Sequence, residues 1–449
     1  MVTLNKRLIF WLVKAYIKKW GKTFFLFFLI GLVVFFLLKS AIVPFMTKIF
    51  SSNQEIIGVS GSYTPSTLPS VLLSKMSRGL TKVADNGDVL PDVATSWQIQ
   101  DDKTYTFHLS HSVVFSDGTP LTVKDIHYNF SNVTVIKPDN YTIVFHLQDV
   151  YAPFLVTVSR PIFKDGFVGI STYKVQDVKL NGDFIQSFTL VSLKDAGQRI
   201  TYQFYPTEDS VKVAFSLGEI GKMSITDLSF QNTTFPNFPN VSISKDTEYS
   251  QLVTLFYNTL DRNLNDKKLR DALSYALPDT FPEGQRAYSP ISPLSFAYQE
   301  TNLHTKDLAH AKLLLSASLG DDTTKYPVLT IATLPKYKKV AVIVANSWKD
   351  LGIQTKIVQV DSLPSSFQIY LGDFTVPKDP DQYTLWHSFQ SNNITNFKSP
   401  RIDKILEDGR KTLAQDERVK IYSDFQKYLL DEQPATFLYF PYLYTVTRK

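Results

Sequence analysis

In the stretch "FSDGTPLTVKDIHYNF", residues 115–130, the turn "SDGTP" lies between an alternating segment and the start of a helix. In residues 104–114, which precede it, apolar and polar side chains alternate, as in a strand with one buried face. Asp117-Gly118 provides a residue that can adopt positive φ, and Pro120 fixes the backbone dihedral at the exit of the turn. The stretch therefore predicts a strand followed by a tight turn.

A helix start follows this turn. Thr122 stands three residues before Asp125, the spacing at which a hydroxyl and a carboxylate cap the exposed amides of a first helical turn. We expect a short helix there.

Similar alternation of strands and turns continues over residues 55–250, whereas residues 252–376 alternate between strands and helices.

The C-terminal part predicts two helices and a strand. Ser399 and Pro400 have the cap and first-turn positions of one helix, and Pro434 ends the next. "TFLYFPYLYTV" follows and is apolar on both faces, which favours a central strand.

Composition limits the classes of function. The chain has 449 residues, of which 44% are hydrophobic, enough for two or three packed domains. It contains no cysteine, which excludes disulfides, thiolate metal sites, a cysteine nucleophile and a lipid-modified cysteine anchor.

The N-terminal region predicts a membrane anchor. Residues 23–38, "TFFLFFLIGLVVFFLL", are uncharged, and the apolar stretch continues past Lys39, so we expect a transmembrane helix over residues 23–43. Residues 1–22 are basic and contain no acidic side chain, which places them in the cytoplasm and the remainder outside. The alternative for the apolar segment is a cleaved signal peptide. The basic segment is either an amphipathic helix on the inner leaflet or only a topogenic flank.

The folded part is slightly acidic. Of the 47 Lys and Arg residues, eight lie in residues 1–50, which contain no Asp or Glu; the remaining 39 stand against 42 acidic residues, a net charge of −3. The basicity therefore belongs to the anchor, and we expect no nucleic-acid partner.

Signals for catalysis are weak. His108 and His111 are the closest pair of the seven histidines, but their spacing on a strand sends them to opposite faces, so they cannot share a metal ion. Nucleophile-elbow, phosphate-loop, dinucleotide and zinc-protease motifs are absent from the sequence. We expect neither an enzyme nor a bound metal or cofactor.

Residues 370–388, "YLGDFTVPKDPDQYTLWHS", concentrate carboxylates and aromatic rings. Such a combination suits a cationic or amphipathic ligand, because a carboxylate pairs with an ammonium group while rings cover apolar surface. The alternative is that the aspartates only shape the turn and cap the next element of the chain. The candidate ligand-binding residues of this segment are Asp373, Asp379, Asp381, Tyr383 and Trp386.

Several motifs, read in order, resemble one family, the extracellular solute-binding proteins of the peptide/nickel type that serve ABC importers. The segments that carry the resemblance are "RGLTKVADNGDVLPDVATSWQIQDDKTYTFHLSHSVVFSDGTPLTVKDIHYNF" (78–130), "AFSLGEIGKMSI" (214–225), "FYNTLDRNLNDKKLRDALSYAL" (256–277), "DPDQY" (379–383) and "SPRIDKILEDGRKT" (399–412). The resemblance covers nearly all of residues 55–449.

The resemblance implies a two-lobed α/β fold like that of periplasmic binding proteins, of type II and in the large peptide-binding subclass, here preceded by one transmembrane helix. The lobes would be joined by hinge strands, with crossings near residues 252–258 and 437–446, and would close over a ligand. The implied domains are lobe I (51–251) with an added strand-rich subdomain (about 80–165), lobe II (252–398), and C-terminal helices with a strand that returns to lobe I (399–449).

The chain departs from the family pattern at points that bear on the ligand. The family's "N-P-x-Y-W" segment is absent after Tyr173, and the helix after "ALSYAL" stops at Pro278. In peptide binders an Asp shortly before "DPD" holds the peptide amine; Thr375 and Val376 stand at that spacing here, and Asp373 lies slightly upstream. From the first lobe, Tyr63 and Ser66 are further candidate ligand contacts, although they also fit an ordinary polar loop.

The function implied by the resemblance is that of a membrane-tethered, extracytoplasmic, bacterial substrate-binding protein. As a monomer it would capture a peptide-like solute and deliver it to ABC permease and ATPase subunits. The alternative is a ligand-sensing receptor or adhesion protein that uses the same fold without transport; a hydrolase would need an activated nucleophile arrangement that the sequence does not contain.

Overall fold

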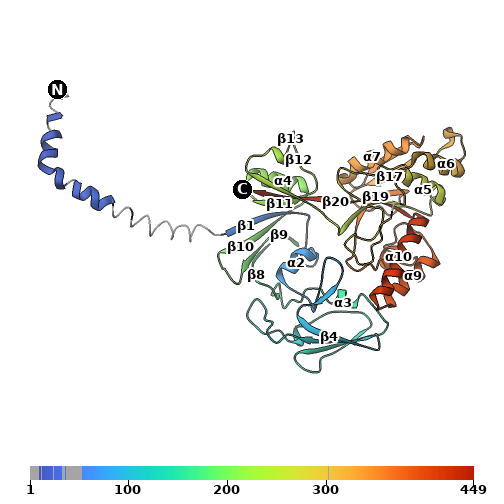
Figure 1. The fold of residues 1–449 in the computed structure, drawn as a ribbon, viewed down its shortest axis with the longest axis horizontal. Coiled ribbons are helices and arrows are strands. Elements are labelled where there is room, and N and C mark those ends of the chain that lie inside the picture. The colour runs from blue at the N-terminus through green and yellow to red at the C-terminus, as the bar shows by residue number, and fades with distance from the viewer. Residues whose placement is uncertain (1–9, 12, 24, 33–35, 37–52, 302) are drawn as a thin grey trace.

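The computed structural model describes residues 10–449 apart from residues 12, 24, 33–35, 37–52 and 302. It has two α/β lobes that share one twelve-stranded sheet (Figure 1). The strands of this sheet are β1 (Asn53–Ser60), β8 (Tyr173–Asn181), β9 (Phe184–Ser192), β10 (Gln198–Tyr205), β11 (Lys222–Ile225), β14 (Val241–Thr247), β15 (Gln251–Tyr257), β16 (Gly284–Arg286), β17 (Leu329–Thr333), β18 (Thr355–Gln359), β19 (Ile369–Thr375) and β20 (Ala435–Arg448). Their order is β18-β17-β19-β15-β20-β11-β1-β10-β9-β8, with β14 and β16 also paired to β20.

Strand β20 belongs to both lobes. Its first half pairs with β15 of the second lobe, and its second half pairs with β11 and β14 of the first lobe. The chain passes from β14 to β15 through residues 248–250, beside the same part of β20, where the Glu248 amide donates to the Pro441 carbonyl at 2.8 Å. The sequence expectation of a central final strand is confirmed. The two passages between the lobes therefore lie next to each other.

A strand-rich subdomain extends from the first lobe. It consists of the hairpin β2 (Thr81–Val83) and β3 (Val89–Pro91), helix α3 (Phe154–Thr157), and the four-stranded sheet of β4 (Ala94–Gln100), β5 (Thr104–Leu109), β7 (Thr142–Leu147) and β6 (Val133–Ile136). Every second residue of β5 is buried, as the alternation predicts. Gly118 has φ of 84°, and the Asp125 carboxylate accepts hydrogen bonds from the Thr122 amide and hydroxyl, ahead of a single 3-10 turn (Val123–Asp125). The expected strand and turn are confirmed. In place of the expected short helix there is only this single 3-10 turn.

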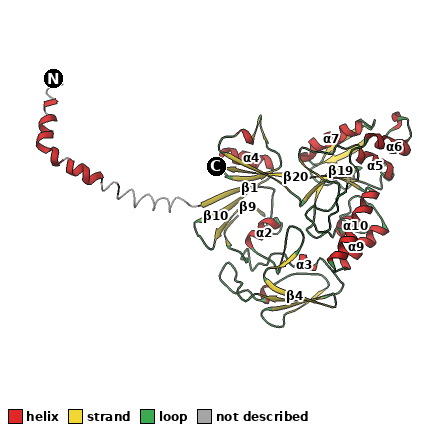
Figure 2. Ribbon diagram, in the orientation of Figure 1, coloured by secondary structure: helices red, strands yellow, loops and turns green. Residues whose placement is uncertain are grey.

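The remaining helices flank the large sheet, and most of them belong to the second lobe (Figure 2). They are α2 (Ser70–Met76) and α4 (Glu208–Leu217) in the first lobe, and α5 (Lys267–Tyr275), α6 (Leu308–Leu319), α7 (Lys338–Lys349), α8 (Tyr383–Trp386), α9 (Pro400–Lys411) and α10 (Gln415–Glu432) in the second. Helices α5 to α7 pack with Val253, Leu255 and Tyr257 of β15, whereas α9 and α10 pack with Leu252 and Phe256. Alternate residues of one strand thus support two cores.

The N-terminal segment is described only in part. The described residues from 10 to 32 are helical, and most of their side chains are exposed. Among the residues that the structure describes, none of the helices is both long and apolar enough to cross a membrane. Much of the anchor predicted over residues 23–43 lies outside the described residues.

Candidate functional site

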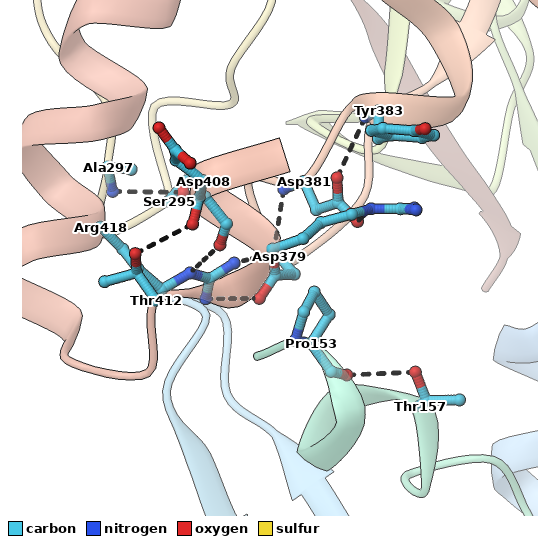
Figure 3. Close-up of polar contacts among 12 residues, drawn as sticks. Pro153, Thr157, Ser295, Ala297, Asp379, Asp381, Tyr383, Asp408, Thr412 and Arg418 are labelled. Carbon is cyan, nitrogen blue, oxygen red and sulfur yellow. Dashed lines mark hydrogen bonds and ion pairs between the residues drawn. The ribbon is translucent and has the colours of Figure 1, made fainter. Parts of the chain in front are cut away.

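The turn between β19 and α8 holds Asp379 and Asp381 (Figure 3), whose side chains are each 7% exposed. As whole residues, Asp379 is 5% exposed and Arg418 of α10 is 6% exposed. The guanidinium of Arg418 donates from Nη1 to Oδ2 of Asp379 at 2.8 Å and from Nη2 to Oδ1 at 2.6 Å. Oδ1 also accepts the Asp381 amide at 2.9 Å. Asp379 therefore both shapes the turn and fixes it to α10.

Asp381 has a second arginine partner. Its Oδ2 accepts from Nε of Arg410, on α9, at 2.8 Å, and its Oδ1 accepts the Tyr383 amide at the start of α8 at 3.0 Å. The Arg410 guanidinium also lies 4.0 Å from the centre of the Tyr383 ring. The DPD turn thus connects α8, α9 and α10.

Electrostatics follow from burial and pairing. Burial lowers the pKa of the Arg418 guanidinium, but the pair with Asp379 more than offsets this and leaves the pKa above its ordinary value. Burial raises the pKa of Asp381, an effect that Arg410 opposes. Both carboxylates have hydrogen-bond and ion-pair partners inside the protein. These bonds agree with the alternative reading of the sequence, in which the aspartates shape the turn. Their ligand-binding role stays a prediction.

A pocket of about 200 Å³ lies in the second lobe. It has mostly apolar and aromatic walls supplied by β15, β19, α8 and the loops before β19 and after α8. Its lining residues are Phe256, Leu363, Tyr370, Asp373, Phe374, Leu385, Trp386, Asn392, Ile394 and Thr395. Phe256 stacks with Trp386 at 6.4 Å between ring centres. Trp386 is held by a hydrogen bond from its indole Nε1 to Gln382 at 2.8 Å, so the rings form a rigid wall.

Asp373 is a lining residue of this pocket by position, but its side chain lies on the opposite face of β19 and forms an ion pair there. Tyr370 and Phe374 share one face of β19, whereas Asp373, an odd number of residues away, belongs to the other. Its Oδ1 lies 3.0 Å from Nζ of Lys336. Burial, with added influence from Asp373, raises the pKa of the neighbouring Tyr337. The assignment of Asp373 as the partner of a peptide amine stays a prediction.

The two candidates from the first lobe lie in the loop after β1. The Tyr63 hydroxyl donates to the Ser60 carbonyl at 3.1 Å, and its ring packs edge-on against Phe204 at 5.7 Å. Ser66 is exposed and its hydroxyl is 3.0 Å from that of Thr64. The hydrogen bonds of both side chains are local, and their predicted role in binding is untested.

Sequence reasoning missed the arginines that hold the DPD turn. Arg418 precedes Tyr422 and Phe425 by four and seven residues, which places it on the buried stripe of α10. A charged residue on an apolar stripe signals an internal partner. Arg410 gave no comparable signal. Among the described residues, no group of three or more His, Asp or Glu side chains could hold a metal ion.

The family of the chain follows from comparison with known sequences. Residues 88–188 and 191–396 match the model described as bacterial extracellular solute-binding proteins, family 5, middle region. The chain belongs to this family. The resemblance read from the motifs is confirmed.

Relatives of this family 5 protein include the probable D,D-dipeptide-binding periplasmic protein of Escherichia coli, 23% identical over 78% of this chain and 79% of the relative. Another is the periplasmic murein peptide-binding protein of the same species, 23% identical over 83% of this chain and 83% of the relative.

Solved structures show the same fold. A Campylobacter jejuni protein, NikZ, in complex with nickel and histidine superposes with a TM-score of 0.75 at 20% identity, over 89% of this chain and 95% of that one. The oligopeptide-binding protein AppA of Bacillus subtilis, in complex with a nonapeptide, superposes with a TM-score of 0.69 at 20% identity, over 88% and 94%. The two-lobed fold of the family 5 proteins is therefore shared by this chain.

Proposed function

We propose that this protein is the substrate-binding subunit of an ABC importer, which captures an oligopeptide-like solute between its lobes and delivers it to a permease. The family of the chain supports solute binding. Relatives named for dipeptides and for murein peptides support a peptide-like solute. The complex of NikZ supports nickel as the competing choice.

One observation carries the proposal of capture between lobes. The lobes are joined where residues 248–250 lie beside Pro441 of β20, so both passages of the chain are at one place. A joint of a few adjacent residues permits rotation of one lobe on the other with small changes in backbone dihedrals. This construction supports the proposal of capture by closure.

The pocket supports a solute with an apolar or aromatic group. Its volume of about 200 Å³ is below the roughly 300–1,000 Å³ typical of pockets that enclose a whole ligand. It therefore suits one side chain of a longer solute. In the proposed site, Trp386 packs against this group, and Asp373, Asp379, Asp381, Tyr383, Tyr63 and Ser66 are the further candidate contacts.

We also propose that the N-terminal region tethers the protein to the membrane. Large apolar side chains of its described helical residues are exposed, with Phe25, Phe27 and Phe28 at 65%, 67% and 66%. Exposed apolar side chains of this kind gain free energy on entering a bilayer. Residues 1–22 would remain in the cytoplasm and the lobes outside. The proposed boundary between the lobes is the one inferred from the sequence, at residues 251/252, and α9, α10 and the first half of β20 complete the second lobe.

Native mass spectrometry of the full chain in detergent, followed by denaturing release, tests the solute. We expect short peptides to co-purify or, if the cleft is empty, a synthetic peptide mixture to bind in calorimetry. Retention of a nickel complex alone would replace the peptide assignment. Failure to bind either class would overturn the proposed function.

A further inference from the structure

We propose that the contacts between the strand-rich subdomain and the second lobe, beside the DPD turn, form a clasp, which holds the lobes closed on the side away from the hinge. The clasp consists of residues 83–88 and 151–152 of the strand-rich subdomain, with Phe296, Lys378, Arg410 and Gln415 of the second lobe. Figure 1 shows this subdomain reaching α9 and α10, away from the passage of β20 between the lobes. The inference rests on the proposed function in one respect, that the lobes open to admit solute.

Backbone hydrogen bonds provide the first part of the clasp. The Ala152 amide donates to the Arg410 carbonyl at 2.7 Å, and the Phe296 amide donates to the Asn86 carbonyl at 3.1 Å. These bonds join segments far apart in sequence and belong to no sheet. They position two edges of the subdomain against the second lobe.

The β2–β3 turn provides the second part. Nζ of Lys378 lies 3.2 Å from the Val83 carbonyl and 3.8 Å from the Asp85 carboxylate, and Nε2 of Gln415 donates to Asp88 at 3.2 Å. Gly87 also lies close to the second lobe. A Cβ built there would lie 3.1 Å from the Lys378 carbonyl and 3.2 Å from the Phe296 ring, at φ of 86°. A side chain at this position would therefore press on the second lobe and require a backbone conformation that favours glycine.

The composition of the clasp suits a contact that separates and re-forms. The side chains of Lys378 and Asp85 are 55% and 91% exposed, and such exposed pairs contribute little to stability. Each backbone hydrogen bond also makes only a small net contribution, because water replaces it when the bond breaks. After the lobes separate, water can solvate the polar groups that these ion pairs and hydrogen bonds had joined. This contrasts with the apolar cores of each lobe, whose separation would expose large apolar surfaces.

The clasp is also connected to the pocket. Arg410, whose carbonyl accepts the Ala152 amide, is paired through its guanidinium with Asp381, and that carboxylate caps the Tyr383 amide at the start of α8. Trp386 at the end of this four-residue helix lines the pocket. A solute that packs against Trp386 therefore contacts α8. This helix is joined through Asp381 to Arg410, whose carbonyl is bonded to the subdomain. Occupation of the pocket and closure of the clasp are expected to favour each other.

Two variants test the clasp without altering the pocket. Lys378→Glu places like charges beside Asp85, and addition of Asp85→Lys restores opposite charges. Gly87→Asn inserts a side chain into the contact while keeping a residue type that tolerates positive φ. The matched control is Lys404→Glu, an exposed lysine of α9 that pairs with Asp408 of its own helix.

The readout is the distance between the lobes, measured in the full chain in detergent. The protein contains no cysteine, so Ser131→Cys on the subdomain and Lys420→Cys on α10, both exposed, label it at two defined sites for single-molecule fluorescence transfer. Without solute, we expect Lys378→Glu and Gly87→Asn to shift the distribution to longer distances, and the charge-swapped double variant to return toward the parent. The Lys404→Glu control should match the parent.

Solute binding gives the second readout. If the parent is mostly closed, a loss of closed-state population lowers apparent affinity in proportion, so we expect the two clasp variants to bind the co-purified solute about three- to tenfold more weakly. Unchanged distances in both variants would overturn the clasp, even if solute binding by the parent upholds the proposed function. Absence of any solute would overturn the proposed function and leave the distance test intact.

Discussion

Arg418 and Asp379 form a bidentate ion pair in the interior of the second lobe, at 2.8 and 2.6 Å. The two residues are 39 positions apart in the sequence. Their pairing fixes the DPD turn to α10, and through this turn it positions α8 and the wall of the pocket.

Removal of Arg418 should destabilise the protein strongly. Arg418→Ala leaves the Asp379 carboxylate buried without its partner, which costs about 3–5 kcal/mol in the free energy of unfolding. Urea unfolding followed by tryptophan fluorescence measures this loss. Lys404→Ala, which breaks an exposed pair of α9, is the control and should change stability by less than about 1 kcal/mol. The pair has no stabilising role if both variants unfold at the same urea concentration.

The double variant Arg418→Met with Asp379→Leu should recover much of the loss. It removes both charges and keeps apolar volume at the site, and such replacements of buried pairs are often neutral. Its urea midpoint should lie above that of Arg418→Ala, either below that of the wild type or higher than it. A midpoint below that of Arg418→Ala would show that the backbone bonds of Asp379, rather than its charge pair, dominate.

Filling the pocket should weaken solute binding with little change in stability. Leu363 is 44% exposed and lines the pocket, so Leu363→Trp places a large ring at its mouth. We expect at least a tenfold weaker apparent affinity in calorimetry, about 1.4 kcal/mol. Leu260→Trp is the matched control, because Leu260 is 72% exposed and is not among the lining residues. Equal affinities of the two variants would exclude the pocket from the binding site.

Acid should weaken an ion pair between the lobes. Asp227 follows β11 in the first lobe, and its Oδ2 lies 3.0 Å from Nζ of Lys339 on α7 of the second. Partial burial raises the pKa of Asp227, but hydrogen bonds from Ser229 and the pair with Lys339 bring it down to about 2. Because this pKa lies below the unfolded value of about 3.9, the stabilisation is fully present above that value and is lost as the pH falls through about 2.

The measurement is the free energy of unfolding between pH 5 and pH 2. In Asp227→Asn this free energy should fall less steeply with acid than in the wild type, and the difference should be modest because both side chains are partly exposed. In 1 M salt the contribution of Lys339 should shrink, whereas that of the Ser229 hydrogen bonds should persist. Identical slopes in the two proteins at low salt would contradict the assignment.

A close backbone contact explains the glycine of "RGL", residues 78–80. A Cβ on Gly79 would lie 2.4 Å from the carbonyl carbon and oxygen of Ser159. Gly79→Ala should therefore lower the melting temperature, with a cost of about 1–3 kcal/mol for the forced displacement. At Gly221 the nearest atom is the Ile56 carbonyl oxygen at 3.9 Å, so Gly221→Ala is the control and should be nearly neutral. A neutral Gly79→Ala would remove this explanation.

Local structure could be read from the sequence to a large extent. The alternation of Tyr105, Phe107 and Leu109 predicts their burial in β5, and the side chain of Ser399 caps α9 by accepting the Ile402 amide. These features depend on neighbours within a few residues, whose spacing the sequence states directly. The order of motifs was sufficient to identify the family.

The partners of charged groups were decided by the tertiary structure. For the aspartates of "DPD" the sequence left two readings open, contact with a ligand or shaping of the turn. Arg418 and Arg410, which pair with them, come from helices and lie 39 and 29 residues further along. Which cation meets a buried carboxylate depends on how helices pack across the sheet, and sequence spacing carries no such information. The sequence alone thus determined the elements, the family and the expectation of an N-terminal anchor. Only the packed structure decided the pocket, the partners of the DPD turn and the contact between the lobes, because each depends on long-range burial of side chains.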